Sequence, residues 1–192
     1  MNEDISGIEG RRVKLRPMTE EDAGPLFDAI QSSREVLRRR LCWVDQVKEL
    51  QDEAAFIRQG IREREERRSL VCGIFDKQTN LFIGVAALAP PDTQNASSAE
   101  LSGWIRADHQ DRGYGTEAFR SLCDHAFLKM QFHRLYARID PGNRPSRKVL
   151  KKLKFRYEGT LREDKKMNGR WVHQECWGVL RSEWSHTQRA SR

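Results

Sequence analysis

The sequence predicts one α/β domain built on a single mixed central sheet that is flanked by helices. Strand-like apolar runs and amphipathic stripes follow one another in the order β-α-α-β-β-β-α-β-α-β-β. The length of 192 residues is typical of one domain. No internal repeat or low-complexity linker divides the chain. We therefore expect a single domain over residues 11–184, with flexible tails at residues 1–10 and 185–192.

The first half of the chain carries three strands and two helices. Residues 12–16 alternate in type and stop at Pro17, as a first strand does. Thr19, followed by three acids, predicts the start of a helix. Two apolar runs, residues 70–75 and 81–88, flank five polar residues and predict a hairpin. The second helix is indicated by apolar residues spaced four, three and four apart: Leu50, Ala54, Ile57 and Ile61.

The second half continues with strands and helices in alternation. A third apolar run covers residues 99–106, and a helix with one apolar face follows residue 116. Residues 135–139 alternate as a strand does, and a short helix carries the apolar residues around 149–153. Two last strand-like runs lie around residues 155–162 and 171–180.

Charge and hydropathy restrict the class of protein. The chain has 35 Lys and Arg residues against 28 Asp and Glu, a net charge of +7, and 33% of its residues are charged. No apolar run approaches the roughly 20 residues of a membrane span, and the first ten residues lack a signal-peptide pattern. We therefore expect a soluble, cytoplasmic protein. The positive excess allows nucleic acid, a phosphorylated cofactor or an acidic protein surface as partner, and does not choose among them.

The cysteines predict no metal site and no disulfide framework. Cys42, Cys72, Cys123 and Cys176 lie about 30 to 50 residues apart, without a CxxC pair. Reduced thiols are the expected state. Cys123 shares an apolar helix face with Leu122, which favours a buried structural thiol over a covalent acyl carrier.

The segment that suggests chemistry is residues 110–116, between a predicted strand and a predicted helix. Gly113 and Gly115 allow a tight turn whose N–H groups approach a ligand closely. The following helix adds unpaired N–H groups and the positive end of its dipole, which suits a phosphate group. Gln110 and Arg112 could add side-chain donors. An ordinary glycine-containing turn is the alternative.

One phosphate-binding alternative is a dinucleotide fold. Gly113, Gly115 and Ala118 fit its G-x-G-x-x-A pattern, and Asp140 could bind the ribose. In that fold, however, the first glycine follows its strand almost directly, whereas here a connection separates Arg106 from Gly113. The chain also leaves too few later strands for a doubly wound sheet.

A second interpretation accounts for more of the chain. Gln110-x-x-Gly113-x-Gly115 resembles the Q/R-x-x-G-x-G/A signature of the GCN5-related N-acetyltransferases (GNAT). Residues 143–155 resemble the family's N-x-x-S segment with its L-G-F ending, although Lys154 replaces the glycine, and residues 158–162 match E-G-x-L-R. Residues 13–17 and 41–44 resemble the opening of the ribosomal-protein alanine acetyltransferase (RimJ/RimL-like) branch. The resemblance spans roughly residues 11–184.

The resemblance implies a GNAT fold, with a largely antiparallel sheet, and acetyl-CoA as co-substrate without a metal. Backbone N–H groups near Trp104 and Ile105 would contact the thioester carbonyl and the pantetheine, and Asn143 would orient the pantetheine amide. Ser146 would protonate the leaving thiolate. The residues implied at the pyrophosphate are those of the turn: Gln110, Asp111, Arg112, Gly113, Tyr114, Gly115 and Thr116.

The general base is the least determined part of the site. Glu100 is the first candidate, acting directly or through water, and a strand-edge acid held in a salt bridge is its alternative. Asn143 and Ser146 also fit turn and helix-capping roles. Tyr114 is expected to pack in the loop rather than to act as an acid, and Trp43 lies in the loop that borders the acceptor cleft in related enzymes.

The expected reaction is direct acetyl transfer to a primary amine, namely the N-terminal α-amine of a ribosomal or other protein. Two alternatives stay open: a small-molecule amine such as a polyamine, an aminoglycoside or an amino-acid antibiotic, and a non-catalytic basic module that binds RNA or the ribosome. Arg112 and Lys148 or Lys151 could face a polyanionic cofactor. We expect no membrane partner and no direct nucleic-acid binding, and the resemblance is compatible with a homodimer.

Overall fold

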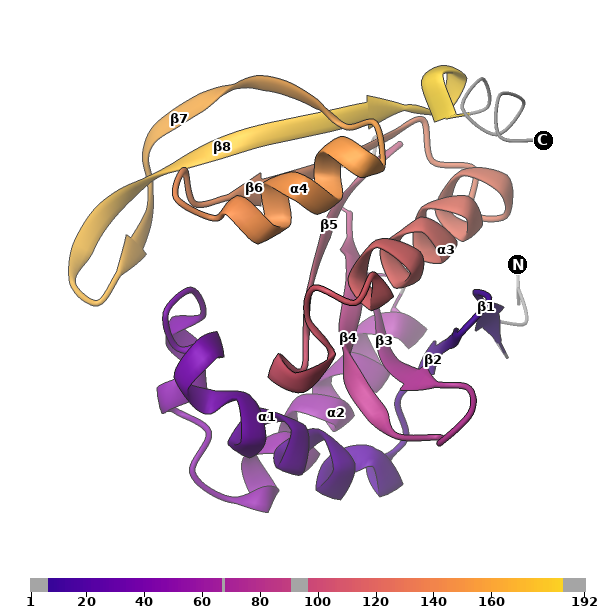
Figure 1. The fold of residues 1–192 in the computed structure, drawn as a ribbon, viewed down its shortest axis with the longest axis vertical. Helices are drawn as coiled ribbons and strands as arrows, with labels where there is room; N and C mark the ends of the chain where they lie inside the picture. The colour runs from indigo at the N-terminus through magenta and orange to yellow at the C-terminus, as the bar shows by residue number, and fades with distance from the viewer. Residues whose placement is uncertain (1–6, 67, 91–96, 185–192) are drawn as a thin grey trace.

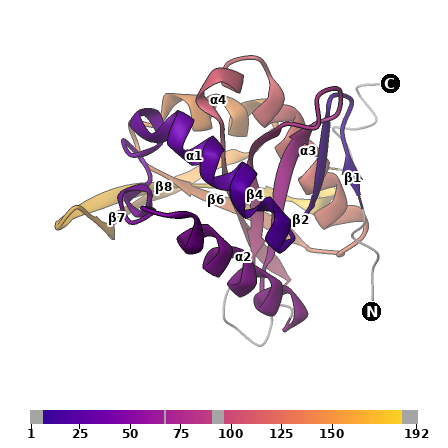
Figure 2. The same ribbon diagram turned by 90° about the horizontal axis from the view of Figure 1, so that it is seen from below.

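The computed structural model describes residues 7–66, 68–90 and 97–184, which form one sheet with helices on both faces (Figure 1). The eight described strands follow the spatial order β1-β2-β3-β4-β5-β6-β8-β7. Helices α1 and α2 lie side by side on one face (Figure 2). Helices α3 and α4 cover the other face.

The order of elements confirms the α/β prediction. The strands are β1 (Ile8–Glu9), β2 (Val13–Pro17), β3 (Leu70–Asp76), β4 (Phe82–Ala89), β5 (Ser98–Ile105), β6 (Arg134–Ile139), β7 (Arg156–Met167) and β8 (Arg170–Leu180). The helices are α1 (Ala23–Leu37), α2 (Leu50–Glu65), α3 (Tyr114–Leu128) and α4 (Arg144–Lys152). Three short 3-10 helices are added: η1 (Glu20–Asp22), η2 (Cys42–Asp45) and η3 (Ala107–His109).

The predicted boundary of the N-terminal tail is wrong. Ile8 pairs with Leu15 in an antiparallel ladder and is only 6% exposed. The ordered domain therefore begins before residue 11, because burial of one isoleucine on the sheet fixes the short strand β1. Residues 1–6 and the predicted C-terminal tail, 185–192, lie outside the described residues.

The sheet is mixed and largely antiparallel, as expected. Among the described strands, only β5 and β6 are parallel, and their ladder covers just residues 98–100 against 134–136. Beyond Glu100 and Tyr136 the two strands are no longer paired with each other. This pattern excludes a doubly wound parallel sheet and with it the dinucleotide alternative. It also leaves one edge of β5 without a strand partner from residue 101 onward.

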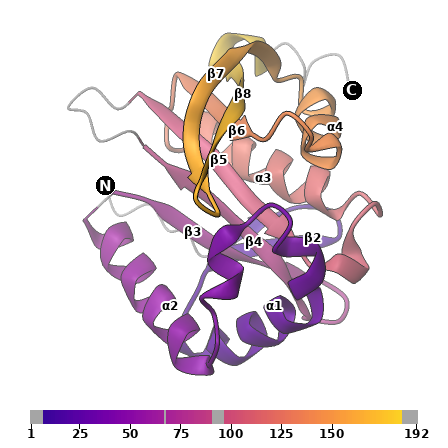
Figure 3. The same cartoon turned by 90° about the vertical axis from the view of Figure 1, so that its left-hand side faces the viewer.

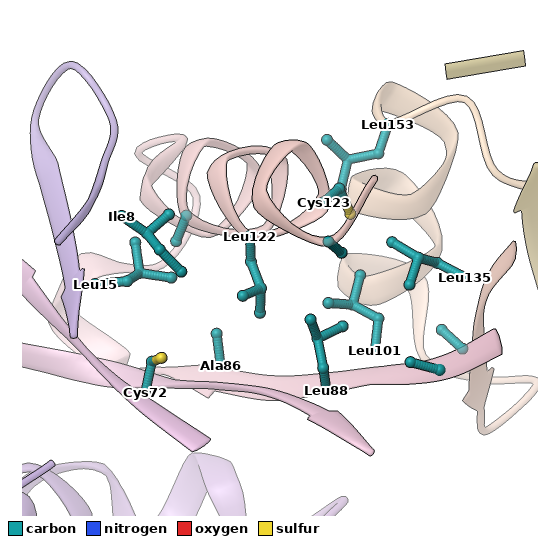
Figure 4. Close-up of a cluster of buried hydrophobic side chains, with 14 of the residues drawn as sticks. Ile8, Leu15, Cys72, Ala86, Leu88, Leu101, Leu122, Cys123, Leu135 and Leu153 are labelled. Carbon is teal, nitrogen blue, oxygen red and sulfur yellow. The ribbon is translucent and has the colours of Figure 1, made fainter. Parts of the chain in front are cut away.

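Two apolar clusters hold the helices on the sheet. Figure 4 shows the larger one, in which Leu122 of α3 points toward the strand that carries Ala86, and Cys123 lies beside Leu153. Burial raises the pKa of the Cys123 thiol, which fits the structural role predicted for it. The second cluster packs α1 and α2 against the opposite face, around Ile30 and Ile57. Sulfur atoms of all four cysteines are free.

The last two strands form a long hairpin. Its turn is Asn168 and Gly169, both with positive φ (47° and 80°), as in the tight turns that match the twist of a hairpin. Strand β7 is exposed along most of its length and lies at the sheet edge. Figure 3 shows the hairpin tip reaching toward the segment after α1. None of the described helices combines the length and the apolar character of a membrane span.

Candidate active site

The turn before α3 has the geometry of an anion site. Asp111 (φ 56°) and Gly113 (φ 87°) adopt left-handed conformations on either side of Arg112, an alternation that makes successive N–H groups converge. Glu117 is the first helical residue whose N–H reaches back to Gly113 O, at 3.1 Å. The N–H groups of the preceding first turn, which includes Thr116, therefore have no carbonyl one turn earlier in the helix. Arg112 adds an exposed guanidinium beside them.

Glu117 fixes this turn to strand β2. Its carboxylate accepts hydrogen bonds from the backbone N–H of Arg12, from Arg12 Nε at 2.9 Å and from Val13 N at 3.3 Å. Arg12 Nη1 also donates to Arg112 O at 3.2 Å. Burial raises the pKa of Glu117, but the hydrogen bonds from Arg12 outweigh it and hold the pKa below its usual value. Charged Glu117 thus orients the start of α3.

Tyr114 anchors the turn through its hydroxyl and its ring. Its hydroxyl donates to Asp76 Oδ2 at 2.7 Å, and the Arg12 guanidinium lies 4.4 Å from its ring centroid. The hydrogen bond to Asp76 raises the pKa of Tyr114, which makes the hydroxyl a weaker proton donor.

The Gln110 side chain is hydrogen-bonded to the end of β5. Its Nε2 donates to Ile105 O at 2.8 Å. Arg106 N donates to Ile83 O at 2.8 Å, toward β4. Because N–H directions alternate along a strand, Trp104 also points its N–H toward β4, and Ile105 points its N–H toward the unpaired edge. Of the two positions near which we expect cofactor contacts, Ile105 is therefore the one whose N–H this alternation directs toward the unpaired edge.

Asn143 and Ser146 lie at the start of α4. Asn143 is the N-cap of the helix, and its Oδ1 accepts a hydrogen bond from Ser146 N at 3.2 Å. The capping alternative therefore holds for the Asn143 side chain. The Ser146 hydroxyl makes no hydrogen bond within the described chain and stays available to a ligand.

Glu100 is held in an ion pair. Arg138 on β6 donates to both of its oxygens, at 2.7 and 3.2 Å, and lies 3.4 Å from Asp164. The hydrogen bond to Glu100 raises the pKa of Arg138. Burial, with the nearby charge of Glu100, raises the pKa of Tyr136 on the same strand. These groups lie where β5 and β6 part, and the salt bridge expected for a strand-edge Glu100 is present.

A basic surface lies on the outer side of α4. It forms a shallow hollow of about 490 Å³ lined by six cations: Arg144, Arg147, Lys148, Lys151, Lys152 and Lys154. Arg147 is paired with Glu175 at 2.6 Å, whereas the charged ends of the other five have no ion-pair partner among the described residues. Such a surface suits a polyanion.

Trp43 lies in η2, directly after α1, and packs against the second cluster. Arg34 of α1 donates to Val44 O at 2.5 Å and to Val47 O at 2.6 Å, which fixes this segment to the helix. Trp104 packs against the same cluster. Both indoles therefore stand on the α1 and α2 face, across the sheet from α3.

Sequence reasoning missed the residues that hold the site together. Arg12, Glu117 and Arg138 act through partners far away in the chain. The alternation of residues 134–139 does place Arg138 on the face opposite to Ala137, but its partner depends on strand order. Of the predicted residues, the structure places the turn directly before α3, Ile105 at the end of β5, and Asn143 and Ser146 at the start of α4. No cluster of three metal-binding side chains was found in the part of the chain that the structure describes.

Comparisons with known proteins agree with this geometry. The family model of the acetyltransferase (GNAT) domain matches residues 12–156. The uncharacterized N-acetyltransferase p20 of Bacillus licheniformis is 31% identical over 112 residues, which cover 58% of this chain and 62% of p20. The chain thus spans less than two thirds of that relative.

Solved structures share the fold. RimL, a ribosomal L7/L12 α-N-protein acetyltransferase in complex with coenzyme A, superposes with a TM-score of 0.84 at 18% identity, over 91% of this chain and 97% of RimL. The microcin C7 self-immunity acetyltransferase MccE, in complex with acetyl-CoA and AMP, gives 0.83 at 20% identity, over 90% of this chain and 94% of MccE. Because the family model covers most of the chain, this protein belongs to the GNAT acetyltransferase family and is an acyltransferase.

Proposed function

We propose that this enzyme transfers the acetyl group of acetyl-CoA directly to the N-terminal α-amine of a protein, ribosomal or other. The observation that carries the proposal is the anion-binding turn at residues 111–116, next to the unpaired edge of β5. A pyrophosphate at the turn directs the rest of an extended cofactor along that edge. Ile105 N–H then donates to the pantetheine arm, which takes the place of a neighbouring strand.

Acetyl-CoA is the co-substrate, and residues of this chain have distinct parts in holding it. The amides of residues 112–116 bind the pyrophosphate, with Arg112 beside them. Lys148 and Lys151 belong to the basic surface of α4, which favours a polyanionic ligand. RimL and MccE were solved with coenzyme A and acetyl-CoA, respectively, which supports this choice of cofactor.

The reaction needs little acid–base chemistry. The amine nitrogen attacks the thioester carbonyl carbon, the C–S bond breaks, and the thiolate takes a proton from Ser146, which regains one from solvent. The amine loses its proton to water and then to Glu100. An α-amine has a pKa of about 8, so a fraction is neutral near pH 7 without help. Glu100 is paired with Arg138, and the water-mediated route fits that pairing better than direct abstraction.

The acceptor is inferred from charge and from the fold neighbours. RimL acts on the α-amine of a ribosomal protein, and its fold matches this chain closely. The net charge of +7 disfavours polycationic acceptors such as polyamines and aminoglycosides. MccE, named for microcin self-immunity, favours the small-molecule alternative, which must therefore be tested alongside. A cytoplasmic location accompanies the proposal, consistent with four free thiols.

A thiol-release assay with a panel of acceptors tests the function. The panel holds peptides with the N-terminal sequences of ribosomal proteins, the same peptides with blocked N-termini, polyamines, aminoglycosides and amino-acid antibiotics. We expect thiol release with free but not with blocked peptides. A higher kcat/KM for a small amine would replace the protein acceptor by that amine. Acetyl-CoA binding without thiol release, together with salt-sensitive RNA binding, would favour the non-catalytic alternative.

Two variants test the assigned roles. Ser146→Ala should lower kcat and leave the dissociation constant of acetyl-CoA unchanged, since the hydroxyl acts on the leaving group. Glu100→Gln should lower kcat by about 100-fold if it accepts the proton through water. An unchanged kcat in Glu100→Gln would assign proton removal to solvent alone.

A further inference from the structure

Strands β5 and β6 stop pairing after Glu100 and Tyr136, and we call the place where they separate the opening between β5 and β6. The segment after α1 contacts the turn that follows β6, on the β6 side of this opening. Arg40 Nη2 donates to Gly142 O at 2.9 Å, and Arg40 Nη1 lies 3.8 Å from Asp140 Oδ2. Gly142 and Asp140 belong to the turn between β6 and α4, whereas Arg40 belongs to the N-terminal half of the domain. One guanidinium therefore spans the two halves of the molecule.

Hydrogen bonds connect the segment around Arg40 to helix α1. The N–H of Arg40 donates to Leu37 O at 3.0 Å, so the backbone continues directly from the end of α1. Arg34 ties the following residues to the same helix through the carbonyl groups of Val44 and Val47. Earlier in α1, buried Ser33 accepts a hydrogen bond from Ala107 N at 2.9 Å. Ala107 lies in the connection between β5 and the anion-binding turn. Helix α1 is thus fixed to the β5 side of the opening.

The turn that Arg40 contacts carries two site residues. Asn143 N donates to Asp140 O at 2.8 Å, which closes the turn, and Asn143 caps α4 through Ser146 N. Arg147 of α4 also holds the turn, because its Nη2 donates to Pro141 O at 2.5 Å. Any shift of this turn therefore moves the Ser146 hydroxyl.

No other polar contact duplicates this bridge. Between residues 19–66 and residues 134–180 of the described chain, the hydrogen bonds and ion pairs all come from Arg40. The sheet itself supplies none beyond Glu100 and Tyr136, because β5 and β6 part there. Among the polar contacts of the described chain, Arg40 alone thus ties the turn at 140–143 to the segment after α1.

We propose that Arg40 is a positioning residue, which holds the turn at residues 140–143 at a fixed position relative to α1. It thereby sets the distance between Ser146 and the segment after α1, which carries Trp43 and lies on the side where we expect the acceptor. The inference rests on the proposed function, in which Ser146 protonates the thiolate. A displacement of about 1 Å at a reacting group is enough to reduce a rate by 10- to 100-fold. Arg40 itself touches neither reactant, so its loss affects the rate more than cofactor binding, which depends mainly on residues 111–116.

The test compares Arg40→Met with a matched control. Methionine keeps an unbranched stem and removes the charged fork, and Arg40→Lys restores the charge without the two-point contact. The control is Arg39→Met, because exposed Arg39 has no hydrogen bond or ion pair within the described chain. Each variant is examined by steady-state kinetics with the best acceptor, by calorimetry with acetyl-CoA, and by amide hydrogen exchange of the free enzyme.

We expect Arg40→Met to lower kcat by about tenfold or more, with an unchanged acetyl-CoA dissociation constant and Tm within about 2 °C of the wild type. The amides of Asn143 and Ser146 should exchange faster, and Arg40→Lys should recover part of kcat. Asp140→Asn should lower kcat in the same direction and add little to Arg40→Met.

Three results would overturn the inference: kcat and exchange in Arg40→Met equal to those in Arg39→Met, a loss confined to acetyl-CoA affinity, or a large fall in Tm with faster exchange throughout α1. Failure of the proposed function is seen separately, as an absence of thiol release by the wild type with every acceptor. Exchange at Asn143 and Ser146 then still decides whether Arg40 holds the turn.

Discussion

Alanine at Gly103 should destabilise the protein far more than alanine at Gly159, although both glycines have nearly the same φ angle. Their φ angles are +150° and +152°, values that side chains rarely adopt. A Cβ at Gly103 would lie 2.2 Å from Val85 O and 2.9 Å from Phe119 Cε1, whereas a Cβ at Gly159 would meet nothing within 4 Å. The pair therefore separates backbone strain from steric overlap.

The expected magnitudes follow from these contacts. Backbone strain costs about 1–3 kcal/mol at either site. Overlap with a main-chain oxygen adds about 1–3 kcal/mol at Gly103 alone, because β4 cannot retreat without losing its ladder to β5. Gly159→Ala should therefore lose about 1–3 kcal/mol and Gly103→Ala about 2–6 kcal/mol.

Urea unfolding followed by tryptophan fluorescence measures both variants, since the chain has five tryptophans. With an m value of about 2 kcal/mol/M, Gly103→Ala should unfold at a midpoint lower than that of Gly159→Ala by about 0.5–1.5 M. Equal midpoints would refute the reasoning, because the close approach of β4 to Gly103 would then have no energetic consequence. A changed m value would instead point to a different denatured state and would require a second probe.

Three further predictions concern single side chains. Gly113→Ala should weaken acetyl-CoA binding by about tenfold in calorimetry, because φ is +87° and its Cβ would lie 3.3 Å from Arg12 Nη2; an unchanged affinity would contradict the phosphate site. Lys154→Gly should raise the free energy of unfolding by about 1 kcal/mol, since Lys154 has φ 64° at the end of α4, and an unchanged Tm would count against strain there. Burial, with the charge of Asp52, raises the pKa of Glu53 to about 7, so the folded state retains a proton that the unfolded state has released between pH 4.5 and 7. Stability from Glu53 is thus lost as pH rises through that window, by up to about 3 kcal/mol, and Glu53→Gln should be the more stable protein at pH 8 but not at pH 4.5.

The elements that could be predicted are those whose signals are local. Apolar spacing at Leu50, Ala54 and Ile57 is set by the helical period, and α2 begins at Leu50. Strand β1 could not be found in this way, because two residues become a strand only when Ile8 meets Leu15. The Asn168–Gly169 pair is a local hairpin signal that would have extended β7 to Met167, beyond the predicted end at residue 162.

In the candidate site, too, features set by single residues could be predicted, and features that depend on distant partners could not. The glycines of the turn were found because positive φ at Gly113 is a property of a single residue. The partner of Glu100 was not, since Arg138 becomes its neighbour only through the parallel pairing of β5 with β6. Gln110 shows the same limit: the signature identifies the residue, but only the structure shows its amide on Ile105 O.

The unpaired edge of β5 gives the fold a physical reason to bind an extended ligand. A strand that parts from its neighbour leaves N–H groups without partners, and Ile105 N–H points toward that edge. Water satisfies such a group in the free enzyme, whereas the amide groups of a pantetheine arm satisfy it with the spacing of a neighbouring strand. Any ligand that binds only the folded state also stabilises it, in proportion to the logarithm of its concentration over the dissociation constant. Cofactor binding therefore satisfies backbone groups that the short β5–β6 ladder leaves unpaired, and Arg40 supplies an independent bridge across the same place while the cofactor is absent.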